Sequence, residues 1–151
     1  MGTRSNLIIE DSYHRIQLYR HWNGYPEGSD GVLATLEDAF PYAWLLPRFE
    51  ASDFSAAIIR GWKEGGGNIY IDGSPVGWEL IHGDVEWVYI IKPKKAPKNP
   101  FDFLNISPIV EVYDWHPYWF DKTDPDTKKP KPHCTVDLVK AREVGSDWKQ
   151  N

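Results

Sequence analysis

A histidine and two carboxylates lie within one short segment of the chain, at His21, Glu27 and Asp30. Side chains of these types move protons in general acid–base catalysis and also bind metal ions. The same segment, RHWNGYPEG, carries large aromatic side chains, and tryptophan and tyrosine often anchor binding surfaces. We therefore expect a partner- or ligand-binding site here and assign no catalytic residue. The candidate site residues are His21, Trp22, Asn23, Tyr25, Glu27 and Asp30.

Two other interpretations of this segment compete with a binding site. In the first, its residues only build a turn: Asn23-Gly24 favours a tight turn, and the carboxylates of Glu27 and Asp30 favour the positive end of a following helix. In the second, His21, Glu27 and Asp30 form the site of a small hydrolase or nucleotide-processing enzyme. Acid–base side chains paired in a cleft would favour the enzyme, whereas an exposed apolar patch rimmed by charge would favour binding.

A second group of metal-ligating residue types lies nearer the C-terminus: Asp114, His116, Asp121, His133 and Cys134. Their spacing matches no zinc pattern, and a single cysteine supplies little thiolate. His133 and Cys134 are adjacent, so in a strand their side chains would point to opposite faces and could not pair as base and nucleophile. We therefore expect no bound metal and no cofactor.

Lysine and proline dominate two further segments, KPKKAPKNP (92–100) and DKTDPDTKKPKP (121–132). Such segments are typical of exposed loops with extended character. If both reached one edge of the molecule, their ammonium groups could contact phosphates or an acidic protein, but few aromatic residues and no arginine accompany them for reading bases. We expect solvated loops and no sequence-specific nucleic-acid binding. The lysines are Lys92, Lys94, Lys95, Lys98, Lys128, Lys129 and Lys131.

Two strands are expected to lead into the candidate segment. Residues 3–10 and 15–22 are rich in strand-forming residues, and the four residues between them suit a hairpin loop. The second strand alternates between one face with Ile16, Leu18 and Arg20 and another with Gln17, Tyr19 and His21. This period of two is typical of a strand in a sheet.

Two helical segments are expected to follow. Ser29 is the expected cap of the first, which has one apolar face and is interrupted by Pro41. The second is expected over about 53–64, capped by Ser52 or Asp53, and the glycines after it favour its end. Its apolar residues form one stripe that includes Phe54, Ile58 and Trp62.

Strand-like segments make up most of the remaining sequence, over 68–72, 76–82, 85–92, 108–115 and 133–139. Glycine-containing turns between the first three favour hairpins. This order predicts one α+β domain over residues 1–151, with a largely antiparallel sheet, two or three helices packed on one face, and a polar C-terminal tail from about 140.

The composition supports a folded, acidic protein. Of the 151 residues, 41% are hydrophobic and 15% aromatic, which argues against disorder. The net charge of −5 argues against broad nucleic-acid binding. One cysteine excludes an intrachain disulfide, and no apolar stretch suits a signal peptide or a membrane span. We expect a cytoplasmic protein with no membrane partner.

The segments TRSNLIIE and YRHWNGYPEG resemble the start of small uncharacterised proteins common in phages and prophages. Those proteins begin with Thr-Arg-Ser and a hydrophobic strand and continue as His-Trp-Asp-Gly-Tyr-Pro-Glu-Gly. The resemblance is specific from His21 to Gly28, and this chain has Asn23 where the pattern has aspartate. It implies a phage or prophage context and supplies no mechanism.

Together these features predict a non-catalytic, phage- or prophage-derived cytoplasmic protein that binds a host or viral macromolecule. Its expected partner is a host or phage protein, because tryptophan and tyrosine are abundant and no complete catalytic set is present. The alternatives are the hydrolase or nucleotide-processing enzyme described above and a structural or assembly component.

Overall fold

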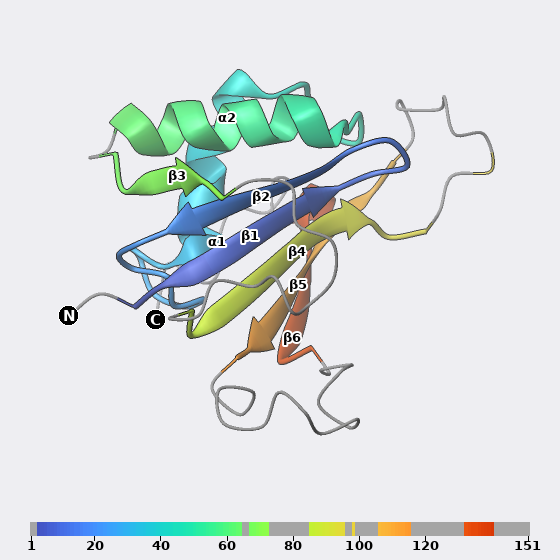
Figure 1. Cartoon of the computed structure of the whole chain (residues 1–151). Helices are drawn as coiled ribbons and strands as arrows, with labels where there is room; N and C mark the ends of the chain where they lie inside the picture. The colour runs from blue at the N-terminus through green and yellow to red at the C-terminus, as the bar shows by residue number, and fades with distance from the viewer. Residues whose placement is uncertain are drawn as a thin grey trace.

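The computed structural model describes residues 3–64, 67–72, 85–95, 98, 106–115 and 132–140. Within these residues six strands form one sheet in the order β3-β2-β1-β4-β5-β6 (Figure 1). Neighbouring strands are antiparallel except for β1 and β4, which run parallel. The strands are β1 (Ser5–Glu10), β2 (Arg15–Arg20), β3 (Ile69–Ile71), β4 (Trp87–Pro93), β5 (Pro108–Asp114) and β6 (Cys134–Asp137).

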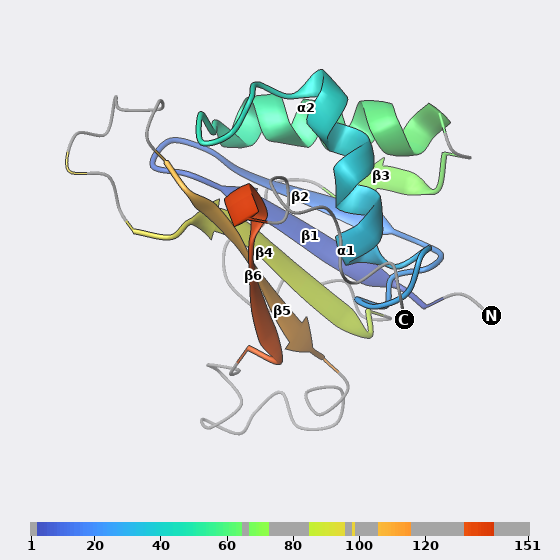
Figure 2. The same ribbon diagram turned by 180° about the vertical axis from the view of Figure 1, so that it is seen from behind.

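Within the described residues, the helical elements α1, η1 and α2 pack on one face of this sheet, which confirms the predicted α+β class (Figure 2). They are α1 (Val32–Thr35), the 3-10 helix η1 (Leu36–Tyr42) and α2 (Ala51–Glu64). The expected cap at Ser29 is wrong, because Gly31 holds the N-cap position and gives no side-chain hydrogen bond. Pro41 lies inside η1, in keeping with the expected interruption.

Helix α2 buries the predicted stripe of Phe54, Ile58 and Trp62. It begins at Ala51, earlier than expected, and Asp53 does not cap it: the Asp53 carboxylate accepts a hydrogen bond from the Trp44 amide at 3.1 Å. The cap comes instead from the hairpin between β1 and β2. There the Asp11 carboxylate accepts hydrogen bonds from the amides of Tyr13 and His14 and, through its other oxygen, from the Ala51 amide, each at 2.8 Å.

The hairpin of β1 and β2 has the predicted four-residue loop, since Glu10 pairs with Arg15 across the two strands. Side chains alternate along each strand and give the sheet two different faces. We call the face under the helices the helix face and the other the opposite face. The helix face holds the larger core cluster, including Leu7, Leu18, Phe54, Tyr89 and Val110. A smaller cluster includes Ile8, Tyr19, Val88, Ile90 and Tyr113 on the opposite face.

Several predictions lie outside the described residues. They are the strand at 76–82 with its turns, the residues His116 and Asp121, the lysines at 128, 129 and 131, and the polar tail after Lys140. The assignment of all 151 residues to one domain stays a prediction. Within the described part of the chain, no helix combines the length and apolar character that a bilayer crossing requires.

Candidate binding surface around the loop after β2

Arg20, the last residue of β2, holds the candidate loop through hydrogen bonds to its backbone. Its side chain lies on the helix face and is only 5% exposed. Each guanidinium nitrogen donates a hydrogen bond: Nε to the Trp22 carbonyl at 3.0 Å, Nη2 to the Asp30 carbonyl at 3.2 Å and Nη1 to the Thr35 hydroxyl. The guanidinium also stacks 4.3 Å from the centre of the Trp62 ring. One buried cation therefore joins both ends of the loop to α1 and α2.

Burial lowers the pKa of Arg20 without removing its charge at neutral pH. Loss of hydration lowers the pKa of its guanidinium to about 10, and the phenol groups of Tyr89 and Tyr25 oppose this shift. The guanidinium is therefore charged at neutral pH. Its charge faces carbonyl and hydroxyl oxygens as acceptors, which suits a structural role for Arg20 in holding the loop.

A second anchor, Tyr89 of β4, fixes the middle of the loop. The fully buried Tyr89 hydroxyl donates a 2.6 Å hydrogen bond to the Gly24 carbonyl, and the Gly24 amide donates one to the Thr3 carbonyl at 2.7 Å. Burial raises the pKa of Tyr89 well above its usual value, so the phenol keeps its proton for this bond. A Cβ atom at Gly24 would lie 2.6 Å from the Thr3 carbonyl oxygen, so only glycine fits there.

Within the turn, Asn23 has a left-handed backbone conformation, with a φ of 56°. Asparagine adopts this left-handed conformation more readily than most residues. After the turn, the Tyr25 carbonyl accepts the Val32 amide at 2.8 Å and the Pro26 carbonyl accepts the Leu33 amide at 3.3 Å. The carbonyl groups of the loop therefore satisfy the first amides of α1 in place of a capping side chain.

The loop carries its candidate side chains in different directions. His21 contacts the Tyr19 hydroxyl through Nδ1 at 3.1 Å, toward the opposite face. Burial raises the pKa of the Cys134 thiol on β6, and the negative charge of the Glu27 carboxylate adds to this shift. The residue paired with Cys134, Val112, belongs to the helix-face core. The backbone of Asp30 is held by Arg20. Among the described residues, no hydrogen bond or ion pair joins His21 to either carboxylate, so the hydrolase arrangement lacks its contacts.

The remaining three candidates differ in exposure. Trp22 is 54% exposed, the largest exposed side chain of the loop. Tyr25 and Asn23 are half-buried, and their side chains lie 3.5 Å apart, from the Tyr25 hydroxyl to Asn23 Oδ1. A partner approaching the loop would therefore meet Trp22 first.

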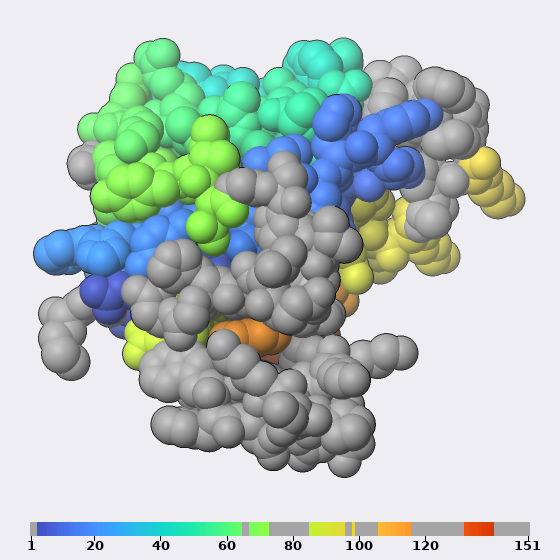
Figure 3. Space-filling view, in the orientation of Figure 1, coloured from blue at the N-terminus to red at the C-terminus, as the bar shows by residue number. Residues whose placement is uncertain are grey.

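Four rings form a continuous row from the loop to the edge of the sheet, which we call the aromatic row: Trp22, His21, Tyr19 and Tyr70. Successive ring centres are 5.6, 5.9 and 6.1 Å apart. Its two ends, Trp22 and Tyr70, are both more than half exposed. In Figure 3, the light green atoms of β3 reach the surface beside the blue atoms of β2 and the loop. The sequence pattern placed Tyr19 and His21 on one face, but the tertiary fold added Tyr70.

Beside the aromatic row, three polar side chains form what we call the carboxamide site: Asn6, Gln17 and Asp72. Asp72 Oδ2 accepts hydrogen bonds from Asn6 Nδ2 and Gln17 Nε2, both at 2.9 Å. Asn6 and Gln17 are fully buried, whereas Asp72 is half-buried. Gln17 Oε1 is buried and has no hydrogen-bond partner. Sequence reasoning missed this site, because residues of β1 and β2 meet the end of β3 only in the folded chain.

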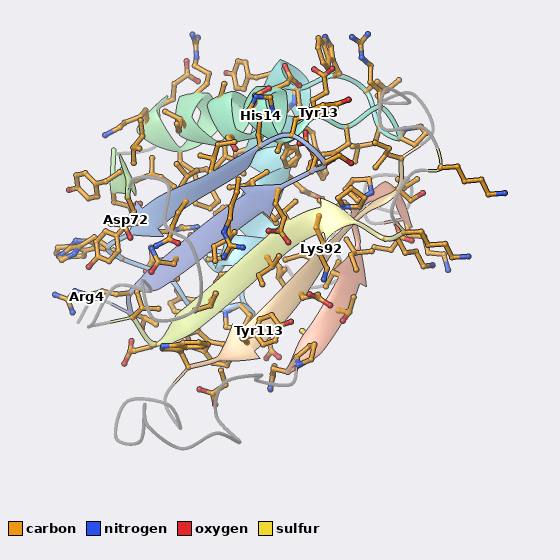
Figure 4. The ribbon with its side chains drawn as sticks, turned by 45° about the vertical axis from the view of Figure 1, so that its right-hand side comes forward. Arg4, Tyr13, His14, Asp72, Lys92 and Tyr113 are labelled. Atoms are coloured by element: carbon orange, nitrogen blue, oxygen red, sulfur yellow. The ribbon has the colours of Figure 1, made fainter. Side chains whose placement is uncertain are left out.

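A separate group of charged side chains lies on the opposite face, over β4 and β5. Lys92 Nζ lies 2.8 Å from Glu111 Oε1, and the Tyr113 hydroxyl donates to that oxygen at 3.0 Å. Figure 4 shows Lys92 and Tyr113 well away from Asp72. Lys92 therefore belongs to β4 and is paired, unlike the solvated loop lysine that the sequence predicted. Lys94, Lys95 and Lys98 are exposed, as expected for a loop.

The second group of metal-ligating residue types, from which no metal site was expected, does not converge where it is described. His133 packs its ring edge against Trp87 at 5.4 Å, whereas Cys134 is a free thiol. Loss of hydration raises the pKa of Cys134, and the Glu27 carboxylate adds to the effect, so the thiol is a weak nucleophile. Within the described residues, no three histidine, cysteine or carboxylate side chains are placed to share a metal ion.

A signal for Arg20 as an anchor was present in the sequence, since Arg20 shares the alternation phase of Ile16 and Leu18 and therefore the buried face. No comparable signal identified Tyr89 as the partner of Gly24. Comparison of this chain with models of protein families, with curated proteins and with solved structures gave no match.

Proposed function

We propose that the protein is a non-catalytic binding protein, derived from a phage or prophage and acting in the cytoplasm, whose loop after β2 contacts a host or viral protein. The observation that carries this proposal is Trp22, a large apolar ring 54% exposed on a loop whose backbone is fixed on both sides. Exposed tryptophan on a rigid support is typical of the residues that dominate protein–protein binding energy.

The rigidity of the loop supports binding for an energetic reason. Association costs free energy when flexible segments must be ordered, and a pre-ordered contact avoids that cost. Arg20 and Tyr89 order the loop from inside the protein, without using Trp22 or the aromatic row. The exposed ring of Trp22 is therefore available to a partner in a fixed position.

The enzyme alternative receives no comparable support. General acid–base catalysis needs its groups within hydrogen-bond reach of one another or of a shared substrate. Among the described residues no hydrogen bond or ion pair joins His21, Glu27 and Asp30 to one another: His21 contacts Tyr19, and Arg20 holds the backbone of Asp30. The proposed function therefore assigns these three residues to the rim of a contact surface and not to a reaction.

Affinity capture from a bacterial lysate tests the proposal, with tagged wild-type protein compared against two single-tryptophan variants. Trp22→Ala is expected to lose the captured protein and keep the melting temperature, because more than half of the ring is exposed. Trp44→Ala, in the segment between η1 and α2 and 38% exposed, is the matched control and is expected to capture normally. Capture that survives in Trp22→Ala, or that fails equally in both variants, would contradict the proposal.

A further inference from the structure

Between η1 and α2, the chain exposes apolar side chains on an anchored turn. Trp44 is 38% exposed and Leu45 is 68% exposed, and Pro47 is exposed as well. The Leu45 carbonyl accepts a hydrogen bond from the Arg48 amide at 3.2 Å, which closes the turn, and the next residue, Phe49, is buried in the helix-face core. Exposed apolar side chains on a fixed backbone are typical of a contact surface. We call Trp44, Leu45, Pro47 and Arg48 the Trp44 patch.

The side chain of Arg48 lies against this surface and does not extend freely into solvent. The central carbon of its guanidinium group is 3.5 Å from the centre of the Trp44 ring, in a cation–π contact. Stacking of this kind restricts the side chain before any partner arrives. A partner that pairs with the Arg48 guanidinium therefore loses less free energy to side-chain ordering than it would at a mobile arginine.

The positive charge of Arg48 is not neutralised by any acidic group among the described residues. Glu50 and Asp53 lie close along the chain, but neither forms an ion pair with it, and the Asp53 carboxylate accepts the Trp44 amide instead. Of the three guanidinium nitrogens of Arg48, only Nε is buried without a hydrogen-bond partner. Its Nη1 and Nη2 groups are therefore open to solvent and to a partner.

Arg60 on α2 shows the contrasting arrangement. It also lies over an aromatic ring, with 5.0 Å between its guanidinium carbon and the centre of the Tyr42 ring. Its charge is already paired, because Arg60 Nη2 lies 2.8 Å from Glu64 Oε1. Of these two stacked arginines, only Arg48 has its charge available for a carboxylate from another molecule.

We propose that the Trp44 patch binds an acidic segment of a protein partner, in which a carboxylate lies next to apolar side chains. The carboxylate accepts hydrogen bonds from Nη1 and Nη2 of Arg48, a bidentate geometry that arginine favours. The apolar side chains pack on Trp44 and Leu45. In both ribbon views the patch lies at the end of the molecule that holds the β1–β2 hairpin, and the loop after β2 lies at the other end (Figure 1 and Figure 2). The patch is therefore a second contact surface, independent of Trp22.

The charges favour a peptide segment over two other occupants. A nucleic acid could stack a base on Trp44, but it brings a negative charge with every nucleotide to a chain with a net charge of −5. A second copy of the chain carries the same net charge, so two copies repel each other. An acidic segment needs to bring only one carboxylate, directly to Arg48.

The test is a titration of the ¹⁵N-labelled full chain with two peptides, N-acetyl-Leu-Asp-Leu-Phe-amide and the same peptide with asparagine in place of aspartate. The signals followed are the indole N–H of Trp44 and the Nε–H of Arg48, identified by their loss in Trp44→Phe and Arg48→Lys. We expect the acidic peptide to shift both signals in a saturable way. The asparagine peptide is expected to bind about fivefold more weakly, because it lacks the charge that pairs with Arg48.

Three variants separate the charge from the apolar contact. Arg48→Gln is expected to bind both peptides equally, each about as weakly as the wild type binds the asparagine peptide, whereas Arg48→Lys keeps a preference for the acidic one. Leu45→Ser is expected to weaken both peptides alike, by about threefold. The control Arg15→Gln removes the same unit of charge on the opposite face of the sheet and is expected to bind as the wild type does. The melting temperature of each variant shows that it is folded.

The inference is overturned if neither signal moves, if the wild type binds the two peptides equally well, or if Arg48→Gln keeps the preference for the acidic peptide. It is also overturned if a uridine hexanucleotide binds more tightly than the acidic peptide, or if the wild type self-associates in ultracentrifugation and Trp44→Ala does not. Trp22→Ala is expected to bind the acidic peptide normally, and Trp44→Ala keeps the protein captured through Trp22. The two proposals therefore fail separately.

Discussion

Two buried polar side chains of β2, one on each face of the sheet, differ in how completely they are hydrogen-bonded. On the helix face, Arg20 is almost fully buried and each of its guanidinium nitrogens has a partner. On the opposite face, Gln17 is fully buried as well, yet its amide oxygen has none. Both residues belong to β2, three positions apart and on its two different faces.

The complete pairing of the Arg20 guanidinium indicates a structural role for this residue. A buried polar group with every bond satisfied within the chain stabilises one arrangement of that chain. A buried atom without a partner gives no such stabilisation, because its lost hydration is not replaced. On this view Arg20 orders the loop, and the exposed ring of Trp22 is the part of it that we propose contacts the partner.

Replacing Arg20 tests the structural half of this comparison and is expected to have the largest effect. Arg20→Met removes three charge-assisted hydrogen bonds, two of them to loop carbonyls, together with the stacking on Trp62, so the free energy of unfolding should fall by ~3 kcal/mol or more. Urea unfolding measures this loss. Arg15→Met, on the opposite face of the same strand, breaks only a half-exposed ion pair with Glu10 and should cost less than ~1 kcal/mol. Equal losses of stability in the two variants would contradict the structural role of Arg20.

Gly24 tests whether the loop is packed rigidly against the end of β1. Gly24→Val would place a Cβ atom 2.6 Å from the Thr3 carbonyl oxygen, and the resulting shift should lower the unfolding free energy by ~2 kcal/mol. Asn23→Gly is the paired control: glycine adopts the φ of 56° without strain, so stability should stay within ~0.5 kcal/mol of the wild type. A stable Gly24→Val protein would mean that the loop is loosely attached and that Trp22 is not held in place.

The smallest expected effect comes from removing the hydroxyl group of one of two tyrosines on adjacent strands, Tyr89 and Tyr113. Tyr89→Phe leaves the Gly24 carbonyl without its donor and should cost ~1 kcal/mol of unfolding free energy. Tyr113→Phe removes a hydroxyl that contacts the half-buried Glu111 and should cost less.

The pH dependence of stability follows from the raised pKa of Tyr89. Above pH ~10 a tyrosine of the unfolded chain ionises while buried Tyr89 stays neutral, so the unfolded state gains and stability falls.

The stability difference between wild type and Tyr89→Phe should therefore shrink as the pH rises above that value, and stay constant below it. Unfolding curves at neutral and alkaline pH measure both parts. A difference that does not change with pH would show that Tyr89 titrates normally and is not buried as an anchor. Comparing two variants of one chain removes the contribution of Arg20, which both proteins share.

Local patterns in the sequence were enough to predict the fold class and much of its core. The period of two along β2 predicted which of its residues share a face, and the helical stripe predicted that Phe54, Ile58 and Trp62 are buried. The four-residue hairpin between β1 and β2 was also predicted correctly. These features depend on neighbours in the sequence, so composition and spacing were enough to identify them.

Only the tertiary structure decided which distant residues meet. The parallel pairing of β1 with β4, the capping of α2 by Asp11 and the Tyr89–Gly24 bond each join parts of the chain with no shared local pattern. The same holds for the site: the sequence identified His21 and Trp22, but Tyr70 joins their aromatic row, through Tyr19, only because β3 pairs with β2. Strand order depends on the packing free energy of the whole chain, and a period of two carries no information about which strand lies next to which.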